Sequence, residues 1–94
     1  MKDHFYLGAE KITVELVPGL ALSTGNAGQA ILPQNLIQVD AALSKEARDV
    51  IFAEEMVHTI IARCGRDDLN DDHTFITPFA TLLCQALKTG GMIK

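Results

Sequence analysis

The amino-acid sequence predicts an α+β fold, in which a small antiparallel sheet of about three strands packs on a long helix and a C-terminal helix. The first half of the chain contains short runs that alternate apolar and polar residues and are rich in β-branched side chains, as strands are. The second half contains two stretches in which apolar residues recur with a helical period. Strands that precede the helices, rather than alternating with them, are typical of α+β proteins.

Three stretches of the first half are expected to be strands. Residues 11–17 alternate apolar and polar side chains and stop at a Pro-Gly pair. Residues 29–32 and 36–40 flank a Pro-Gln-Asn turn that is short enough to join them into a hairpin. On composition, residues 23–28 form a loop. Residues 5–7 are a further candidate for a short strand.

The first helix is predicted from its ends. Ser44 is a suitable N-cap, Glu46 complements the positive end of the helix dipole, and Gly65 follows the last residue, Cys64. An acidic run, residues 67–72, comes next and is typical of a solvated turn. Calcium binding is a weaker interpretation, because the run lacks the glycine and the terminal glutamate of a calcium loop.

The second helix covers at least residues 79–88, and a Gly-Gly pair ends it. Two residues could cap the start of this helix. Asn70 could cap a helix that contains Pro78 in its interior, which would cost one hydrogen bond and cause a kink. Alternatively, Thr77 caps the helix and Pro78 takes the first helical position, where proline is favoured.

Length and composition limit the functions that the chain can have. Its 94 residues are expected to make one domain, residues 1–94, with a modest two-layer core. A formal net charge of -4, without a cluster of Lys or Arg, argues against nucleic acid or an anionic membrane as a partner. No apolar run suits a signal peptide or a membrane-spanning helix. We expect a cytoplasmic protein in which Cys64 and Cys84 are reduced core thiols rather than a disulfide.

The first helix places a carboxylate where an apolar side chain is expected. At about 100° per residue, Glu54 points to the middle of the apolar stripe of this helix, His58 lies about 40° away and Glu55 lies at the border. The stripe consists of Ala47, Val50, Ile51, Val57 and Ile61. Burying an unpaired carboxylate is expensive, and no Lys or Arg shares this face. Glu54 is therefore satisfied either by a hydrogen bond, for instance from His58, or by a metal ion.

Glu54 and His58 have the i, i+4 spacing at which two side chains of one helix can hold a single cation. The pattern E-E-x-x-H is related to H-E-x-x-H, in which two histidines hold zinc and the intervening Glu acts on the water. A carboxylate ligand makes the site more anionic and widens the choice of metal toward manganese or iron. His73, beyond the acidic turn, is the candidate third ligand. The competing interpretations are a core histidine at position 58, a surface histidine at position 73 and a solvent-facing Glu55.

Over about residues 11–90, the chain resembles the small zincin-like metallopeptidases often encoded in phages and prophages. The resemblance is carried by the predicted strands, the Ser-Lys-Glu start of the first helix, the Glu54–His58 motif and the Leu-Asn-Asp entry to the last helix. It implies a motif helix packed under a small sheet, with a Glu of the next helix completing a zinc site. Glu55 and His58 match the catalytic Glu and the second histidine. Glu54 replaces the first histidine, and Thr77 lies near the position of the third ligand.

Two functions follow from this resemblance. In the first, the chain is a metal-dependent peptide hydrolase in which Glu54, His58 and His73 bind zinc or another divalent metal. Glu55 would take a proton from the attacking water, and an exposed sheet edge would align an extended peptide. In the second, the chain is a catalytically impaired relative that binds a peptide or a protein, with or without a metal. The replacements at positions 54 and 77 favour this second function. The sequence predicts no oligomeric state.

Overall fold

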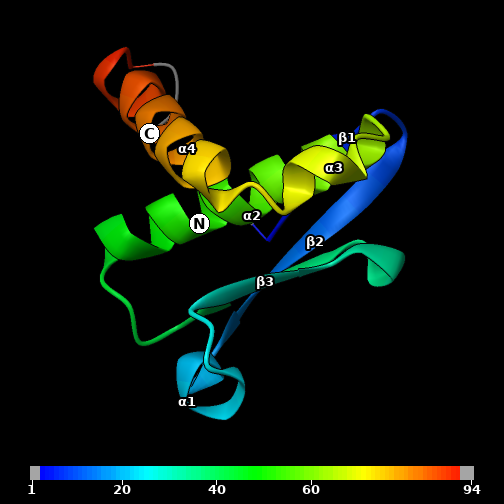
Figure 1. Ribbon diagram of the computed structural model, residues 1–94. Coiled ribbons are helices and arrows are strands. Elements are labelled where there is room, and N and C mark those ends of the chain that lie inside the picture. Colours follow the sequence, from blue (N-terminus) through cyan, green and yellow to red (C-terminus); the bar gives the residue numbers. More distant parts are fainter. Residues whose placement is uncertain (1–2, 92–94) are drawn as a thin grey trace.

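The computed structural model describes residues 3–91 and confirms the α+β fold. Helix α2 lies between the sheet on one side and helix α4 on the other (Figure 1). The elements in chain order are β1 (His4–Leu7), β2 (Glu10–Val17), α1 (Leu20–Thr24), β3 (Gly28–Ile31), the 3-10 turn η1 (Leu32–Gln34), β4 (Leu36–Asp40), α2 (Lys45–Arg63), α3 (Asp67–Asn70) and α4 (His73–Thr89).

Within the described residues, the sheet has four strands in the order β1-β2-β4-β3, so the prediction of about three antiparallel strands is wrong in two respects. Residues 5–7 do belong to a strand, β1. In addition, β2 and β4 are parallel, with Val14 opposite Ile37, because α1 and β3 carry the chain across before β4 returns beside β2. The predicted hairpin is confirmed, since β3 and β4 are antiparallel with Ala30 opposite Ile37. β3 is an edge strand of the sheet.

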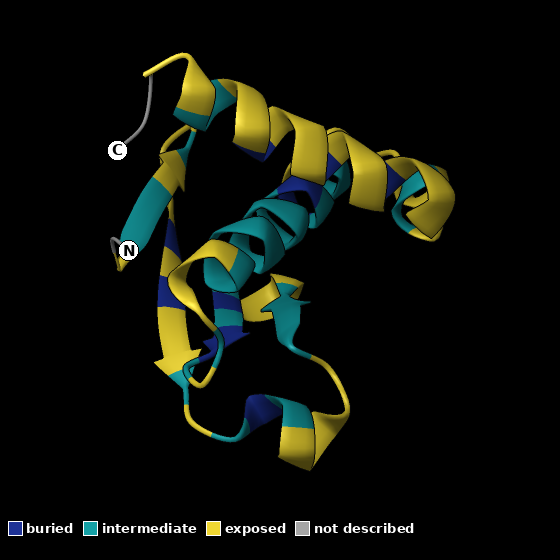
Figure 2. Ribbon diagram, turned by 90° about the vertical axis from the view of Figure 1, so that its left-hand side faces the viewer, coloured by how far each residue is buried: buried dark blue, intermediate teal, exposed yellow. Residues whose placement is uncertain are grey.

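The apolar core is divided between the two sides of α2. On the sheet side, the buried residues are Ile12, Val14, Ile37 and Val39, and residues packed against them include Ile51 and Phe52 of α2. On the other side, Val57 of α2 packs with Ile76 and Ala80 of α4. Helix α2 is therefore covered from two directions, and the exposed surface of α4 faces away from the core (Figure 2).

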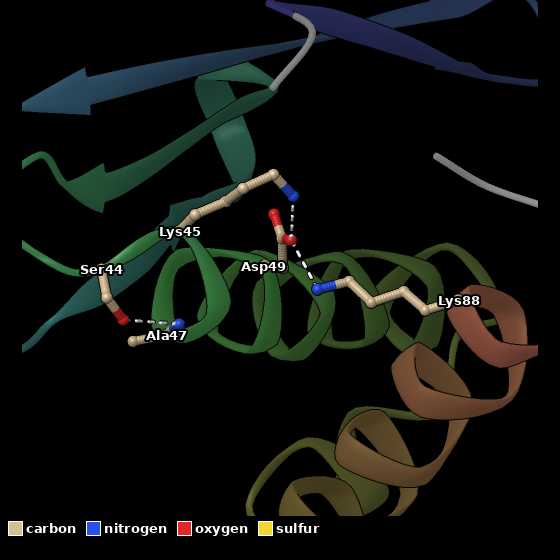
Figure 3. A network of polar contacts seen from close by, with 5 residues as sticks. All are labelled: Ser44, Lys45, Ala47, Asp49 and Lys88. Carbon is tan, nitrogen blue, oxygen red and sulfur yellow. Dashed lines mark hydrogen bonds and ion pairs between the residues drawn. The ribbon is translucent and has the colours of Figure 1, made fainter.

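Helix α2 begins and ends as the sequence predicts. The Ser44 hydroxyl accepts a hydrogen bond from the Ala47 amide at 3.2 Å, and Gly65 adopts a left-handed conformation just beyond the helix. In its first turns, Asp49 binds Lys45 Nζ at 3.0 Å and Lys88 Nζ of α4 at 2.5 Å (Figure 3). Burial raises the pKa of Asp49, but the two lysine hydrogen bonds outweigh burial and hold this pKa below its usual value. Asp49 therefore ties the end of α4 to the start of α2.

The region between α2 and α4 differs from the prediction. Part of the acidic run forms the short helix α3 instead of a plain turn. Helix α4 begins at His73 with Asp72 as its N-cap, so neither Asn70 nor Thr77 is the cap. Pro78 lies inside the helix, as in the first of the two predicted solutions. Complete burial of Ile76, worth about 1.5–3 kcal/mol, helps to offset the hydrogen bond lost at Pro78.

Two smaller predictions also need correction. The stretch 23–28, expected to be a loop, overlaps the end of α1. Both cysteines are free, but only Cys84 is buried; Cys64 is exposed at the C-cap of α2 and is not a core thiol. Within residues 3–91, no helix is long and apolar enough to cross a membrane.

Candidate metal centre

A cleft of about 470 Å³ opens between the edge strand β3, the middle of α2 and the start of α4. This volume lies in the range of small-molecule binding pockets. The lining residues are Asn26, Ala27, Gly28, Gln29, Ala30, Leu32, Ile51, Glu54, Glu55, His58, Asn70 and His73. The cleft therefore contains all four site residues predicted from the sequence, and neither Lys nor Arg is among the residues that line it.

The three predicted metal ligands converge in this cleft. Glu54, His58 and His73 each offer one ligand atom, and these atoms lie within 4.8 Å of one another. Two of the residues come from successive turns of α2, and the third comes from the first turn of α4. His73 reaches the pair because α4 starts directly after Asp72; a start at Thr77 would have removed it from the helix.

Glu54 is half-buried, which corrects the expectation of a carboxylate at the centre of a buried face. The apolar stripe of α2 combines residues covered by different neighbours: Val57 faces α4, whereas Ile51 faces the sheet. At about 100° per residue, Glu54 and His58 point between these two directions. The gap between the sheet and α4 is the cleft, so the carboxylate lines an opening and does not enter the core.

The ring of His58 is held by Asn70 of α3. Asn70 Nδ2 donates to the backbone oxygen of His58 at 3.2 Å, which leaves Asn70 Oδ1 as an acceptor. His58 Nδ1 lies 3.0 Å from this oxygen. The proton of a neutral His58 therefore sits on Nδ1, and the lone pair of Nε2 is free. This is the arrangement by which an outer hydrogen bond prepares a histidine to bind a metal.

The other two predicted ligands have simpler surroundings. Glu54 Oε1 accepts a hydrogen bond from the Thr77 hydroxyl at 3.1 Å. His73 is exposed, and the centre of its ring lies 5.3 Å from that of His58. Thr77 thus assists the carboxylate of Glu54, although a threonine cannot replace a carboxylate ligand.

Glu55 is half-buried and lines the cleft, so it is not the solvent-facing residue of the competing interpretation. Burial raises the pKa of its carboxyl group; the charge of His58 opposes this rise and that of Glu54 adds to it. A carboxyl group with a raised pKa suits the uptake and release of a proton. β3 approaches closely here, because a Cβ atom at Gly28 would lie 3.3 Å from Glu55 Cγ.

The three donors fit a divalent metal ion. A zinc ion binds imidazole nitrogen and carboxylate oxygen at about 2.0–2.2 Å, which sets its ligands roughly 3–4 Å apart. The observed limit of 4.8 Å needs only a small rotation of side chains, and the exposed His73 has room for it. Two imidazoles and one carboxylate form a known set of catalytic zinc ligands that leaves a coordination position open. The same set also suits ferrous iron.

Sequence reasoning did not identify Asn70 and Gly28 as parts of the site. The sequence suggests Asn70 as a helix cap, although an amide near the predicted histidines is also the kind of residue that orients a ligand. Gly28 gave no signal beyond its place near a strand, because the close approach of β3 to α2 is a property of the tertiary structure.

Comparison of the chain with protein-family models, with curated proteins and with solved structures finds no match. The resemblance to zincin-like metallopeptidases therefore stays a prediction.

Proposed function

We propose that this chain is a metal-dependent hydrolase of peptide bonds, with a zincin-like site in which Glu54, His58 and His73 hold a divalent ion. The observation that carries the proposal is the convergence of these three side chains within 4.8 Å, in a cleft that Glu55 also lines. A divalent ion bound there would polarise the scissile carbonyl and acidify a water molecule. The coordination position that three protein ligands leave open supports a catalytic rather than a structural ion.

The residues of the chain have separate roles in this reaction. The Glu55 carboxylate takes the proton of the attacking water and passes it to the nitrogen of the leaving amine. Asn70 holds the His58 ring, and Thr77 holds the Glu54 carboxylate. The edge strand β3 forms one wall of the cleft and offers backbone groups that can pair with an extended peptide.

Metal content tests the first part of the proposal. We expect the chain, purified without chelator, to carry one divalent ion, and mass spectrometry of the metal would show whether this is zinc, manganese or iron. Glu54→Ala, His58→Ala and His73→Ala should each lose the ion. His4→Ala is the matched control, because His4 lies on β1 at the opposite edge of the sheet. A folded wild-type protein that takes up no divalent ion, even when the ions are supplied, would overturn the proposal.

A specific observation favours a second function, in which the cleft binds a peptide or a protein without hydrolysis. Two groups of the site already have a partner within the protein: Glu54 Oε1 accepts from the Thr77 hydroxyl, and His58 Nδ1 pairs with Asn70. Glu55→Gln separates the two functions. Loss of hydrolysis of an unfolded test protein such as casein, with the ion retained, supports the enzyme. A wild-type chain that carries the ion but cleaves no peptide, while it still binds one, supports the binding protein.

A further inference from the structure

Helix α4 has a second apolar face, which is exposed in the part of the chain that the structure describes, residues 3–91. Phe75, Phe79 and Leu82 are 44%, 45% and 63% exposed, and Ala86 is also exposed. At about 100° per residue, these four side chains point within about 60° of one another, roughly 130° away from the face that packs on α2. In Figure 2, most of the ribbon of α4 has the colour of exposed residues. A helix that is apolar on two sides is typically buried on both.

The spacing of this outer face is that of a helix-pairing seam. Its positions 75, 79, 82 and 86 are separated by four, three and four residues, which is the a/d repeat of helices that pack along their length. Phe75 and Phe79 are already stacked, with ring centres 5.3 Å apart. The outer face is therefore ordered before any partner arrives, and it fits another helix better than an irregular or extended segment.

The absence of charge on the outer face of α4 indicates which kind of helix can pack against it. No charged residue occurs between Thr74 and Leu87, although the whole chain carries a net charge of -4. Two copies of the chain would repel each other through most approaches, but not when these uncharged faces meet. A basic or acidic partner helix would find no charge to pair with on this face. A second copy of α4 brings an equally uncharged and apolar face.

The sizes of the side chains set the direction of such a pair. In an antiparallel arrangement, Phe75 packs opposite the second copy's Ala86, and Phe79 packs opposite its Leu82. Large side chains then meet small ones, and the helices stay at an even distance. In a parallel arrangement, Phe75 would meet its own copy at one end and Ala86 would meet its own copy at the other, which would splay the helices apart.

We propose that the outer face of α4 is the interface of a two-fold symmetric homodimer, in which two α4 helices pack antiparallel. The proposal does not depend on the proposed hydrolase. A two-fold axis between the helices makes the same residues contact one another on both copies. The contact is one helix wide and about 17 Å long, from Phe75 to Ala86 on α4 at 1.5 Å per residue. This is at the small end of specific interfaces, so we expect a reversible, concentration-dependent dimer.

Sedimentation equilibrium over a range of concentrations tests the proposal. The wild-type chain should shift from 10.2 kDa toward twice that mass as its concentration rises. Leu82→Glu should remain monomeric with an unchanged circular dichroism spectrum. Leu22→Glu is the matched control, because Leu22 is 95% exposed on α1, away from α4, and it should dimerise like the wild type. A wild-type monomer at concentrations up to about 1 mM, or equal loss of dimer in both variants, would overturn the proposal.

Exchanging the large and small residues tests the antiparallel arrangement. Ala86→Phe sets a second Phe against Phe75 and should weaken dimerisation at least tenfold. Adding Phe75→Ala to this variant reverses the two sizes and should restore the dimer to within a few fold of the wild type. A parallel pair predicts no such rescue, so a double variant that dimerises no better than Ala86→Phe would exclude the antiparallel arrangement.

Discussion

Asn70 contacts His58 twice, once at the ring nitrogen Nδ1, at 3.0 Å, and once at the backbone oxygen, at 3.2 Å. The second contact uses the amide donor of Asn70, so the first must use its oxygen as acceptor. One short helix thereby fixes both the orientation and the tautomer of a residue that another helix supplies. This leaves Nε2 as the nitrogen of His58 that can act as a ligand in the group formed with Glu54 and His73.

This relationship makes a prediction for the metal-free protein. Nitrogen NMR of the neutral His58 ring should show the proton on Nδ1, and Asn70→Ala should abolish this preference. The same substitution should weaken metal binding by about 10–100-fold, because outer-shell partners contribute that much at metal sites. Asn26→Ala is the control, since Asn26 also lines the cleft but makes no hydrogen bond with His58. Unchanged metal affinity in Asn70→Ala would show that this hydrogen bond is structural only.

The contact between Glu54 and Thr77, at 3.1 Å, makes a second prediction. The resemblance to zincin-like metallopeptidases implies a histidine at position 54 and a carboxylate near position 77. Because the two side chains touch, the carboxylate can move from α2 to α4 without leaving the cleft. Glu54→His combined with Thr77→Glu should keep one ion per chain, whereas Glu54→Ala should lose it. Loss of the ion in the double variant, with the fold intact, would contradict this exchange.

Much of the fold could be predicted because local signals agree with the tertiary structure. The Ser44 cap, the Gly65 end and the β3–β4 hairpin follow from neighbouring residues, and the structure has all three. The parallel pairing of β2 with β4 could not be predicted in the same way. It depends on α1, whose five residues have no side-chain cap of their own and resemble a loop.

The candidate site was predictable in its residues but not in its surroundings. The i, i+4 spacing on α2 identified Glu54 and His58, because both come from one regular helix. The place of His73 depends on where α4 begins, and this start combines the Asp72 cap with burial of Ile76 against α2. Glu54 is partly exposed because the sheet covers α2 on one side of it and α4 covers α2 on the other. Periodicity merges such neighbours into a single apolar stripe.

The hydrogen bonds of Asp40 predict how the stability of the fold changes with pH. Its carboxylate accepts hydrogen bonds from the Ala42 amide at 2.9 Å and the Ala21 amide at 3.0 Å, and these bonds lower its pKa. A lowered pKa in the folded state stabilises the fold above the ordinary pKa of Asp, and this contribution is lost as the pH falls through the lowered value. Asp40→Asn should therefore flatten the loss of stability between about pH 5 and pH 2.

Urea unfolding at several pH values checks the role of Asp40. Asp67→Asn, at an exposed position of α3, is the control and should keep the acid dependence of the wild type. A steep acid dependence that persists in Asp40→Asn would assign the effect to other carboxylates.

Gly28 makes the last prediction, because it sets how closely β3 approaches the helix that carries the site. A Cβ atom at this position would overlap Ile51 Cγ2 and press on Glu55 Cγ at 3.3 Å. Ile51 is β-branched and turns little about its first bond, so β3 must move away. Gly28→Ala should lower the free energy of unfolding by about 1–3 kcal/mol and displace the wall of the cleft.

In an Ile51→Ala background, Gly28→Ala should cost much less, because the overlapping methyl group is gone. Urea unfolding of the four proteins gives this coupling energy directly. A cost that is equal in both backgrounds would mean that β3 and α2 are not in close contact at Gly28, and the cleft would then need a different wall.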